Sequence, residues 1–328
     1  MLNLKHFRCT FDKYQNFKME VIHNISNYSP QKPSVVTIGT FDGVHIGHQK
    51  IIRDLVSKAK SEDLSAIVLT FSPHPRMVLQ KDTQLKMIDT LEEKRQLLEI
   101  MGVEILIVQP FTQEFSRLTA IEYTRDILVN GLNISRLIIG YDHRFGRNRE
   151  ATADDLKQFG LDYNFTVDKI PAQDVASIAV SSTKVRNTIL AGEIKKTNRY
   201  LGRPFSLIGS IVKGDKIGRK MGYPTANLEI KEKHKLRPNN GVYLVQSQLN
   251  NKICFGMMNI GKRPTVSGKK IQIEIYFFDF EGDLYGNKLK IELLEKIRDE
   301  QKYESLERLG NQLSIDQKSC QKLIPKYL

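Results

Sequence analysis

The segment Gly39–His48, with the sequence GTFDGVHIGH, constrains the fold more than any other part of the chain. It follows the apolar run Val35–Ile38, which is typical of a buried strand, and it precedes an amphipathic helix predicted to begin near Ile46. Its three glycines therefore lie in a strand-to-helix turn, where backbone amides and the positive end of a helix favour bound phosphate. His45 and His48 project from the same turn. This combination predicts nucleoside triphosphate chemistry.

The first half of the chain alternates apolar strand patterns with helical patterns, which is typical of an α/β fold. Two helices are predicted to begin with capping boxes, Thr90 with Glu93 and Thr119 with Glu122. We therefore expect a Rossmann-like parallel sheet covered by helices on both faces, with ligands beyond the carboxyl ends of its strands. The predicted strands are Val35–Ile38, Ala66–Phe71, Glu104–Gln109, Leu137–Gly140 and Phe165–Ile170.

The second half changes character near residues 192–205, where Gly192, Gly202 and Pro204 interrupt the pattern. Its strand candidates follow one another through turns and loops, which predicts a small antiparallel β-barrel followed by helices at Ser305–Leu313 and Asp316–Leu323. We therefore predict an extension over residues 1–18, a parallel-sheet domain over 19–192 and a barrel domain over 193–328. The barrel strands are predicted at Ser206–Val212, Val242–Gln248, Ile253–Met258, Ile271–Phe278 and Lys288–Leu294.

The charge of the chain is unevenly distributed. Its net charge is +13, yet residues 1–190 carry 24 basic against 22 acidic side chains, so the excess lies in the second half. This bias suits either an anionic ligand or an ordinary solvated basic surface. The three cysteines are scattered, and no apolar run is long enough to span a bilayer, so we expect a cytoplasmic protein without a membrane segment.

Three further segments follow strands of the predicted sheet. Ser181–Arg186, with the sequence SSTKVR, predicts a helix start with Ser182 as N-cap, whose hydroxyls, amides and Arg186 suit phosphate binding. Asp142–Arg147 joins a carboxylate to two arginines, although a surface turn with a local ion pair fits equally well. Phe71–Pro75 is held extended by its prolines and offers an aromatic ring, or it is a rigid loop without a chemical role.

The second half has its own cluster, Gly214–Asn227, in which glycines precede a proline-fixed turn. The Thr225 hydroxyl and the Asn227 amide carbonyl are hard oxygen ligands suited to Mg²⁺ that bridges phosphates. This is not a P-loop, because no Gly-Lys-Ser/Thr follows. By strand alternation Glu274 lies opposite the apolar face of its strand, so it is a general-base candidate only if its face meets the Thr225–Asn227 turn.

Taken together, these motifs resemble those of the prokaryotic bifunctional riboflavin kinase/FMN adenylyltransferase family, also called FAD synthetase. The resemblance runs from about Met19 to near the C-terminus. The chain departs from the family pattern at His143, where a phenylalanine is usual, and matches loosely at Arg298–Tyr303. The matching segments are Gly39–His48, Phe71–Pro75, Ser181–Arg186, Gly214–Asn227, Gly241–Tyr243 and Asn259–Thr265.

The resemblance implies two reactions. The C-terminal domain would phosphorylate riboflavin with ATP, with Glu274 as general base and with Thr225 and Asn227 binding Mg²⁺. The N-terminal domain would transfer AMP from ATP to FMN, giving FAD and pyrophosphate, with His45 and His48 stabilising charge on the phosphates.

The resemblance also implies the residues that bind each substrate. ATP in the adenylyltransferase domain would be bound by Gly39, Phe41, Asp42, Gly43, Gly47, Asp142, Ser181, Ser182, Thr183 and Arg186. Flavin in that domain would be bound by Phe71, Pro73 and His74. ATP in the kinase domain would be bound by Gly214, Gly218, Arg219, Gly222 and Pro224, and flavin there by Arg298.

Two alternatives stay open at this point. One is a chain that retains a single activity, with the adenylyl transfer favoured. The other is a basic nucleic-acid-binding protein, because the HxGH turn also resembles that of class I aminoacyl-tRNA synthetases. The absence of a basic stripe with interleaved aromatic residues weakens the second alternative. A homo-oligomer is compatible with the sequence.

Overall fold

The computed structural model describes residues 18–140, 144–147, 150–170, 180–214, 217–265 and 268–328. The chain divides into two compact units between Ser182 and Thr183. The domain boundary expected at 192/193 stays a prediction. Among the described residues, no helix has the length and apolar character that crossing a membrane requires.

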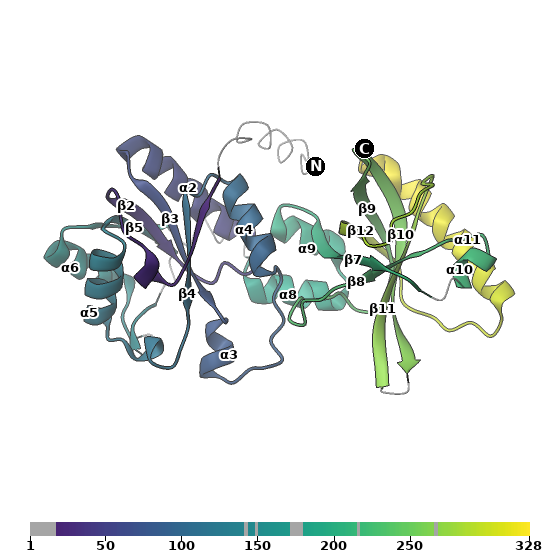
Figure 1. The fold of residues 1–328 in the computed structure, drawn as a ribbon, viewed down its shortest axis with the longest axis horizontal. Helices are drawn as coiled ribbons and strands as arrows, with labels where there is room; N and C mark the ends of the chain where they lie inside the picture. Colours follow the sequence, from purple (N-terminus) through teal and green to yellow (C-terminus); the bar gives the residue numbers. More distant parts are fainter. Residues whose placement is uncertain (1–17, 141–143, 148–149, 171–179, 215–216, 266–267) are drawn as a thin grey trace. The chain divides into compact units, whose positions relative to one another are not determined.

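The first unit is built on a six-stranded sheet with the order β1-β4-β3-β2-β5-β6, in which every neighbouring pair is parallel (Figure 1). The five strands expected from apolar runs are confirmed. The edge strand β1 was missed because a four-residue strand is too short to show a period. The strands are β1 (Glu20–His23), β2 (Ser34–Ile38), β3 (Ser65–Ser72), β4 (Ile105–Pro110), β5 (Ile134–Gly140) and β6 (Thr166–Ile170).

Helices cover both faces of this sheet, as the strand–helix alternation predicts (Figure 1). On one face, Val35 and Val68 pack with Leu55 of α2 (Ile46–Glu62) and Leu98 of α4 (Leu91–Ile100). On the other face, strand residues of opposite parity pack with side chains of a second set of helices. These are the π-helical segment η3 (Tyr123–Gly131) and α6 (Ala153–Tyr163), and the short α5 (Ala120–Glu122) leads into η3.

The predicted capping boxes are confirmed. The Thr90 hydroxyl accepts from the Glu93 amide, and the Glu93 carboxylate accepts from the Thr90 amide; Thr119 and Glu122 do the same at α5. The prediction of Ser182 as an N-cap is wrong, because α8 (Ser182–Ala191) already includes Ser182. Its hydroxyl instead donates to the Asp42 carbonyl at 2.9 Å.

The second unit contains a closed antiparallel barrel with the order β10-β11-β8-β7-β12-β9. The short strand β8 was missed, since its four residues follow a proline turn and read as part of the glycine-rich cluster. The strands are β7 (Phe205–Val212), β8 (Ala226–Glu229), β9 (Gly241–Leu249), β10 (Lys252–Thr265), β11 (Gly268–Phe277) and β12 (Lys288–Arg298), and α9 (Ile194–Leu201) precedes them.

One long helix, α11 (Leu306–Leu323), packs against the barrel where two helices were expected. The expected break near Asp316 does not occur. Asp316 is a buried residue, 1% exposed, and its carboxylate pairs with Arg298 at the end of β12. The ion pair with Arg298 compensates the charge of Asp316, so the helix continues through this residue, although the sequence pattern suggested a break there.

Candidate active sites

The turn after β2 has an unusual backbone conformation. Phe41 and Val44 have φ values of 45° and 35°, and Gly43 has a φ of 87°. Positive φ is strained for a β-branched residue such as Val44, and such strain persists only where surrounding contacts enforce it. A Cβ on Gly43 would lie 2.9 Å from Ile88 Cδ1, so a side chain is excluded at this position.

Asp42 fixes this turn from within. It is fully buried, and its Oδ1 accepts from the Ile88 amide at 2.9 Å and from the Asp89 amide at 3.5 Å. Its carbonyl oxygen accepts from the Ser182 hydroxyl. The Asp42 carboxylate therefore connects the turn to the segment that leads into α4.

The two histidines stack on each other at the start of α2. His45 is the N-cap, and its Nδ1 accepts from the His48 amide at 3.3 Å; the ring centroids are 3.6 Å apart. Because Nδ1 of His45 is an acceptor, the neutral ring carries its proton on Nε2. Gly47 is buried beside them, so the start of α2 is closely packed.

Both histidines are held in the neutral form. Burial lowers the pKa of His45 to about 4. Burial, followed by the charges of His45 and Lys94, lowers the pKa of His48 well below its usual value. His48 Nδ1 is buried and has no hydrogen-bond partner among the residues that the structure describes. At neutral pH these rings can act on a phosphate as N–H donors, not as cations.

The site lies at the topological switch point of the sheet. β2 pairs with β3 on one side and with β5 on the other, so the chain order reverses at β2. Ligands of open α/β sheets bind beyond the strand ends at such a point. Asp142, which follows β5, lies outside the described residues, as does His143.

The residues expected to bind flavin lie at the same sheet edge. Phe71 is the penultimate residue of β3, and its ring packs against those of Phe111 and Phe115, with centroids 5.4 and 5.8 Å apart. Pro73 follows the strand, and His74 caps the short helix α3 (Pro75–Leu79) by accepting from the Arg76 amide at 3.1 Å. The neighbouring Thr70 hydroxyl donates to the Thr40 carbonyl at 3.3 Å, so β3 and the Gly39–His48 turn are joined.

The Ser181–Arg186 segment enters the site through Ser182, which bonds to Asp42. Ser181 directly precedes α8, and Thr183 and Arg186 lie on its first turns. Their roles in phosphate binding stay predictions.

A second candidate site is a cavity of about 310 Å³ in the second unit, between the barrel and α11. Thr225 and Glu274 line it, as do Gln272 and Tyr276, which share the Glu274 face of β11. Glu274 lies opposite Asn227 in the β11–β8 register. The condition set for Glu274 as a general base, that its face meets the Thr225–Asn227 turn, is therefore fulfilled.

A polar bridge organises this cavity. Gln272 Nε2 donates to Asn227 Oδ1 at 2.9 Å and to Glu274 Oε1 at 3.0 Å. Asn227 is only 8% exposed, so its carbonyl oxygen is held in one place. The three side chains form a fixed array of oxygen acceptors beside the Thr225 hydroxyl.

Gly214 and Gly218 of this cluster are required by close packing, and Gly222 by its backbone conformation. A methyl group on Gly214 would overlap the Asn227 amide, and one on Gly218 would overlap the Tyr223 carbonyl. Gly222 has a φ of 81°. Arg219 lies exposed on α10 (Ile217–Lys220), and Pro224 precedes Thr225 in the turn.

Arg298 also lines the cavity. Its Nε and Nη2 donate to the Asp316 carboxylate at 2.9 and 2.7 Å, and its Nη1 donates to the Asp299 carbonyl at 2.9 Å. Gln312 Nε2 also donates to Asp316 at 2.9 Å. The guanidinium of Arg298 is therefore held in a fixed orientation at the cavity wall.

The donors near Asn227 and Thr225 fit a magnesium ion carried by ATP. They are neutral hard oxygens, and within the described part of the chain no group of three His, Cys, Asp or Glu side chains could hold a metal by itself. Mg²⁺ commonly binds through a few protein oxygens together with substrate phosphates. The Asn227 amide packs directly against Gly214, so the backbone there helps to fix this candidate ligand in place.

Sequence reasoning missed three residues at these sites. Lys94 reads as one charge in a mixed helix, yet it is only 4% exposed and contacts the Gly39–His48 turn. Gln272 was not named as a site residue, and Asp316 was predicted only as the start of a helix. Alternation could have suggested Gln272, but no local signal marks the other two as buried.

Comparisons with known proteins agree with this architecture. The family model described as FAD synthetase matches residues 28–184, and the model described as riboflavin kinase matches residues 201–324. A protein of Buchnera aphidicola subsp. Schizaphis graminum, named bifunctional riboflavin kinase/FMN adenylyltransferase, is 38% identical over 90% of this chain and 95% of its own length. An Escherichia coli K12 protein of the same name is 35% identical over 90% of this chain and 94% of its own length.

A solved structure covers nearly the whole chain. It is described as a macrolide-efflux protein from Streptococcus pneumoniae, and it superposes with a TM-score of 0.84 at 31% identity, covering 92% of this chain and 99% of that one. The two-domain order, the identity to the relatives and their coverage together establish the family. The chain belongs to the bifunctional riboflavin kinase/FMN adenylyltransferase family.

Proposed function

We propose that this chain makes FAD from riboflavin in two ATP-dependent steps at two separate sites. The barrel domain phosphorylates riboflavin to FMN, and the parallel-sheet domain adenylylates FMN to FAD. The observation that carries this proposal is that each family domain contains its own polar cluster, the Gln272-bridged array in the barrel and the stacked histidines in the first unit. A chain with one activity would need only one of these clusters.

In the first step, the terminal hydroxyl of the ribityl chain attacks the γ-phosphorus of ATP and ADP leaves. Glu274, which lines the cavity and lies opposite the proposed metal ligand Asn227, accepts the hydroxyl proton. Thr225 and Asn227 would hold the Mg²⁺ of ATP, which neutralises phosphate charge when bound. Arg298, held by Asp316, lines the same cavity and contacts the flavin.

In the second step, a phosphate oxygen of FMN attacks the α-phosphorus of ATP, and the bond to the departing pyrophosphate breaks. The attacking group is already an anion, so this step needs positioning and charge stabilisation more than it needs a base. The neutral rings of His45 and His48 donate N–H groups to the phosphate oxygens. The aromatic residues Phe71 and Phe111 offer packing for the flavin.

The test is incubation of the purified protein with riboflavin, ATP and Mg²⁺, with flavins separated over time. FMN should appear first and FAD afterwards. A protein that yields neither flavin nucleotide would overturn the proposal.

His48→Ala tests the separation of the sites. FAD formation should fall by about two to three orders of magnitude, on the scale of a lost charge-stabilising donor, while FMN formation persists. Loss of both activities from this change would contradict the two-site arrangement.

We further propose that the protein acts in the cytoplasm, which the scattered cysteines support. Its partners are ATP, riboflavin and FMN. The anionic character of these ligands accounts for the basic bias of the second half without a nucleic-acid partner. A homo-oligomer stays a prediction.

A further inference from the structure

A buried lysine that the two proposed reaction steps do not use lies under the Gly39–His48 turn. Lys94 is on α4, is 4% exposed, and its Nζ donates to the Thr40 carbonyl at 2.6 Å and to the Thr70 hydroxyl at 3.4 Å. Lysine is seldom this buried unless it is paired. Asp42 and Asp89 are the acidic groups that act on its charge.

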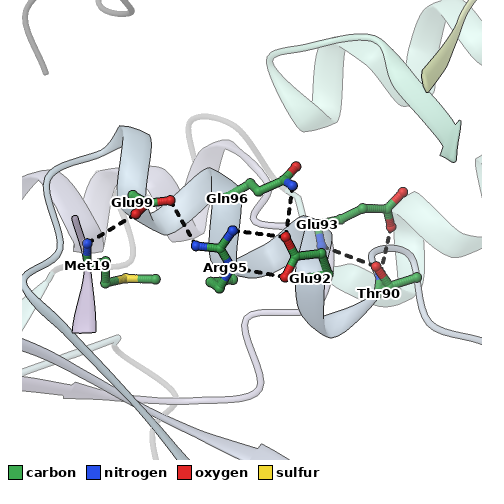
Figure 2. Close-up of polar contacts among 7 residues, drawn as sticks. All are labelled: Met19, Thr90, Glu92, Glu93, Arg95, Gln96 and Glu99. Carbon is green, nitrogen blue, oxygen red and sulfur yellow. Dashed lines mark hydrogen bonds and ion pairs between the residues drawn. The ribbon is translucent and has the colours of Figure 1, made fainter. Parts of the chain in front are cut away.

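Arg95, Glu92 and Glu99 of α4 behave differently from Lys94. Arg95, the next residue, bonds to Glu92 and to Glu99 on the solvent side of the helix, with Nε–Oε2 and Nη1–Oε2 distances of 2.9 and 3.0 Å (Figure 2). Exposed ion pairs of this kind contribute little to stability. The burial of Lys94 is therefore a property of its position and not of a generally charged helix.

The helix that carries Lys94 is anchored at both ends (Figure 2). Thr90 and Glu93 cap its start, with the Glu93 carboxylate 2.6 Å from the Thr90 amide. Near its end, Glu99 accepts from the Met19 amide of the segment that leads into β1, at 3.1 Å. These contacts fix the position of the helix that carries Lys94.

The turn that Lys94 contacts needs such support. Phe41 and Val44 have positive φ, and such strained conformations persist only where surrounding contacts enforce them. Asp42 fixes the middle of the turn to Ile88, while Lys94 fixes its beginning at Thr40. Both contacts are made by one segment, residues 88–94.

We propose that Lys94 is a positioning residue for adenylyl transfer, which holds the Gly39–His48 turn through the Thr40 carbonyl and contributes a buried positive charge next to the two histidines. This inference rests on the proposed function of the first unit. Lys94 itself touches no substrate in this arrangement, because its ammonium is directed to Thr40 and Thr70.

The electrostatics agree with this geometry. The charged or titratable groups that act on His48 are His45 and Lys94, and both lower its pKa. A positive charge is felt more strongly in a buried site than in water. Lys94 therefore helps to keep His48 neutral and adds positive potential where pyrophosphate departs.

The test compares Lys94→Met and Lys94→Arg with Arg95→Gln, a matched control on the same helix. For Lys94→Met, kcat for FAD formation from supplied FMN should fall by about 10- to 100-fold, the scale of a misplaced catalytic group, with the KM for FMN unchanged. Lys94→Arg should recover a large part of this loss because it keeps the charge. Arg95→Gln should match the wild type.

Two further readouts separate positioning from general destabilisation. FMN formation by the same molecules reports that the barrel domain is folded, and circular dichroism reports that the helices and sheet of the first unit are retained. Histidine-selective ¹⁵N NMR should show that the pKa of His48 rises in Lys94→Met and stays low in Lys94→Arg. If Lys94→Met does not fold, Lys94→Gln carries the same test.

Full FAD formation and an unchanged His48 pKa in Lys94→Met would overturn the inference. Equal loss in Lys94→Met and Lys94→Arg, with the His48 pKa unchanged in both, would also overturn it, since Lys94 would then only fill space. A wild-type protein that makes no FAD would instead refute the proposed function, so the two failures are distinguishable.

Discussion

Glu274 lies directly opposite Asn227 across the β11–β8 ladder, and Gln272 Nε2 donates to both side chains. The general-base candidate and a metal-ligand candidate are thus fixed with respect to each other by backbone pairing and by one shared amide. This relationship joins two segments that are well separated in the chain.

Glu274→Gln should therefore strongly reduce the phosphorylation of riboflavin without affecting the formation of FAD from FMN. Glutamine keeps the shape and the contact with Gln272 but cannot accept the proton, so FMN formation should fall by about two to four orders of magnitude. FAD formation from supplied FMN should be unchanged. The control is Glu229→Gln, an exposed carboxylate on β8. Wild-type FMN formation by Glu274→Gln would exclude Glu274 as the base.

Gly214→Ala should also impair the barrel domain alone. The added methyl group overlaps the Asn227 amide, so it should displace the side chain proposed to bind Mg²⁺. We expect a raised Mg²⁺ requirement for FMN formation, measured by titrating the metal at fixed ATP. Gly310→Ala, where an added methyl meets no atom within 4 Å, is the matched control. Identical metal dependence in both variants would argue against Asn227 as a ligand.

Asp316→Ala should destabilise the second unit. The Asp316 side chain is 2% exposed and its bond to Arg298 is bidentate, so its removal leaves a largely buried guanidinium without its counter-charge. Breaking such a pair costs about 3–5 kcal/mol of unfolding free energy, which urea denaturation can measure. Arg308→Ala removes the exposed pair with Glu304 and should change stability by less than about 1 kcal/mol. Similar effects of the two variants would contradict the role given to burial.

Acid should destabilise the first unit through its histidines. The pKa of His45 is about 4 in the folded protein against 6.5 for an unperturbed histidine, so the unfolded chain binds the proton first as pH falls. The contribution of neutral His45 to the free energy of unfolding is complete above pH 6.5. It is lost as the pH falls toward 4, and the loss amounts to roughly 3 kcal/mol for this one group.

His45→Asn is the variant that checks this pH dependence. It keeps an N-cap acceptor but does not titrate. Urea unfolding followed by circular dichroism at pH 7 and pH 4.5 should show a smaller pH effect in the variant than in the wild type. In the wild type, the loss of FAD formation identifies the transition of the first unit. An unchanged pH effect would contradict the burial of a neutral His45.

Much of the fold could be predicted from local pattern. The parallel-sheet strands other than β1, the barrel strands other than β8 and the two predicted capping boxes are where the sequence places them, because apolar periodicity and cap chemistry act within a few residues. The errors are informative: β1 and β8 are too short to show a period, and α11 continues through Asp316 because Arg298 compensates its charge.

The sequence by itself determined the fold class, the strand-to-helix turn at Gly39–His48 that is proposed to bind phosphate and the face of β11 that carries Glu274. Only the tertiary structure decided that Lys94 is buried under that turn, that Gln272 bridges Asn227 and Glu274, and that Asp316 orients Arg298. The physical reason is that periodicity and caps are set by neighbours along the chain. The burial and pairing of a charged side chain instead depend on segments that meet only when the chain is folded.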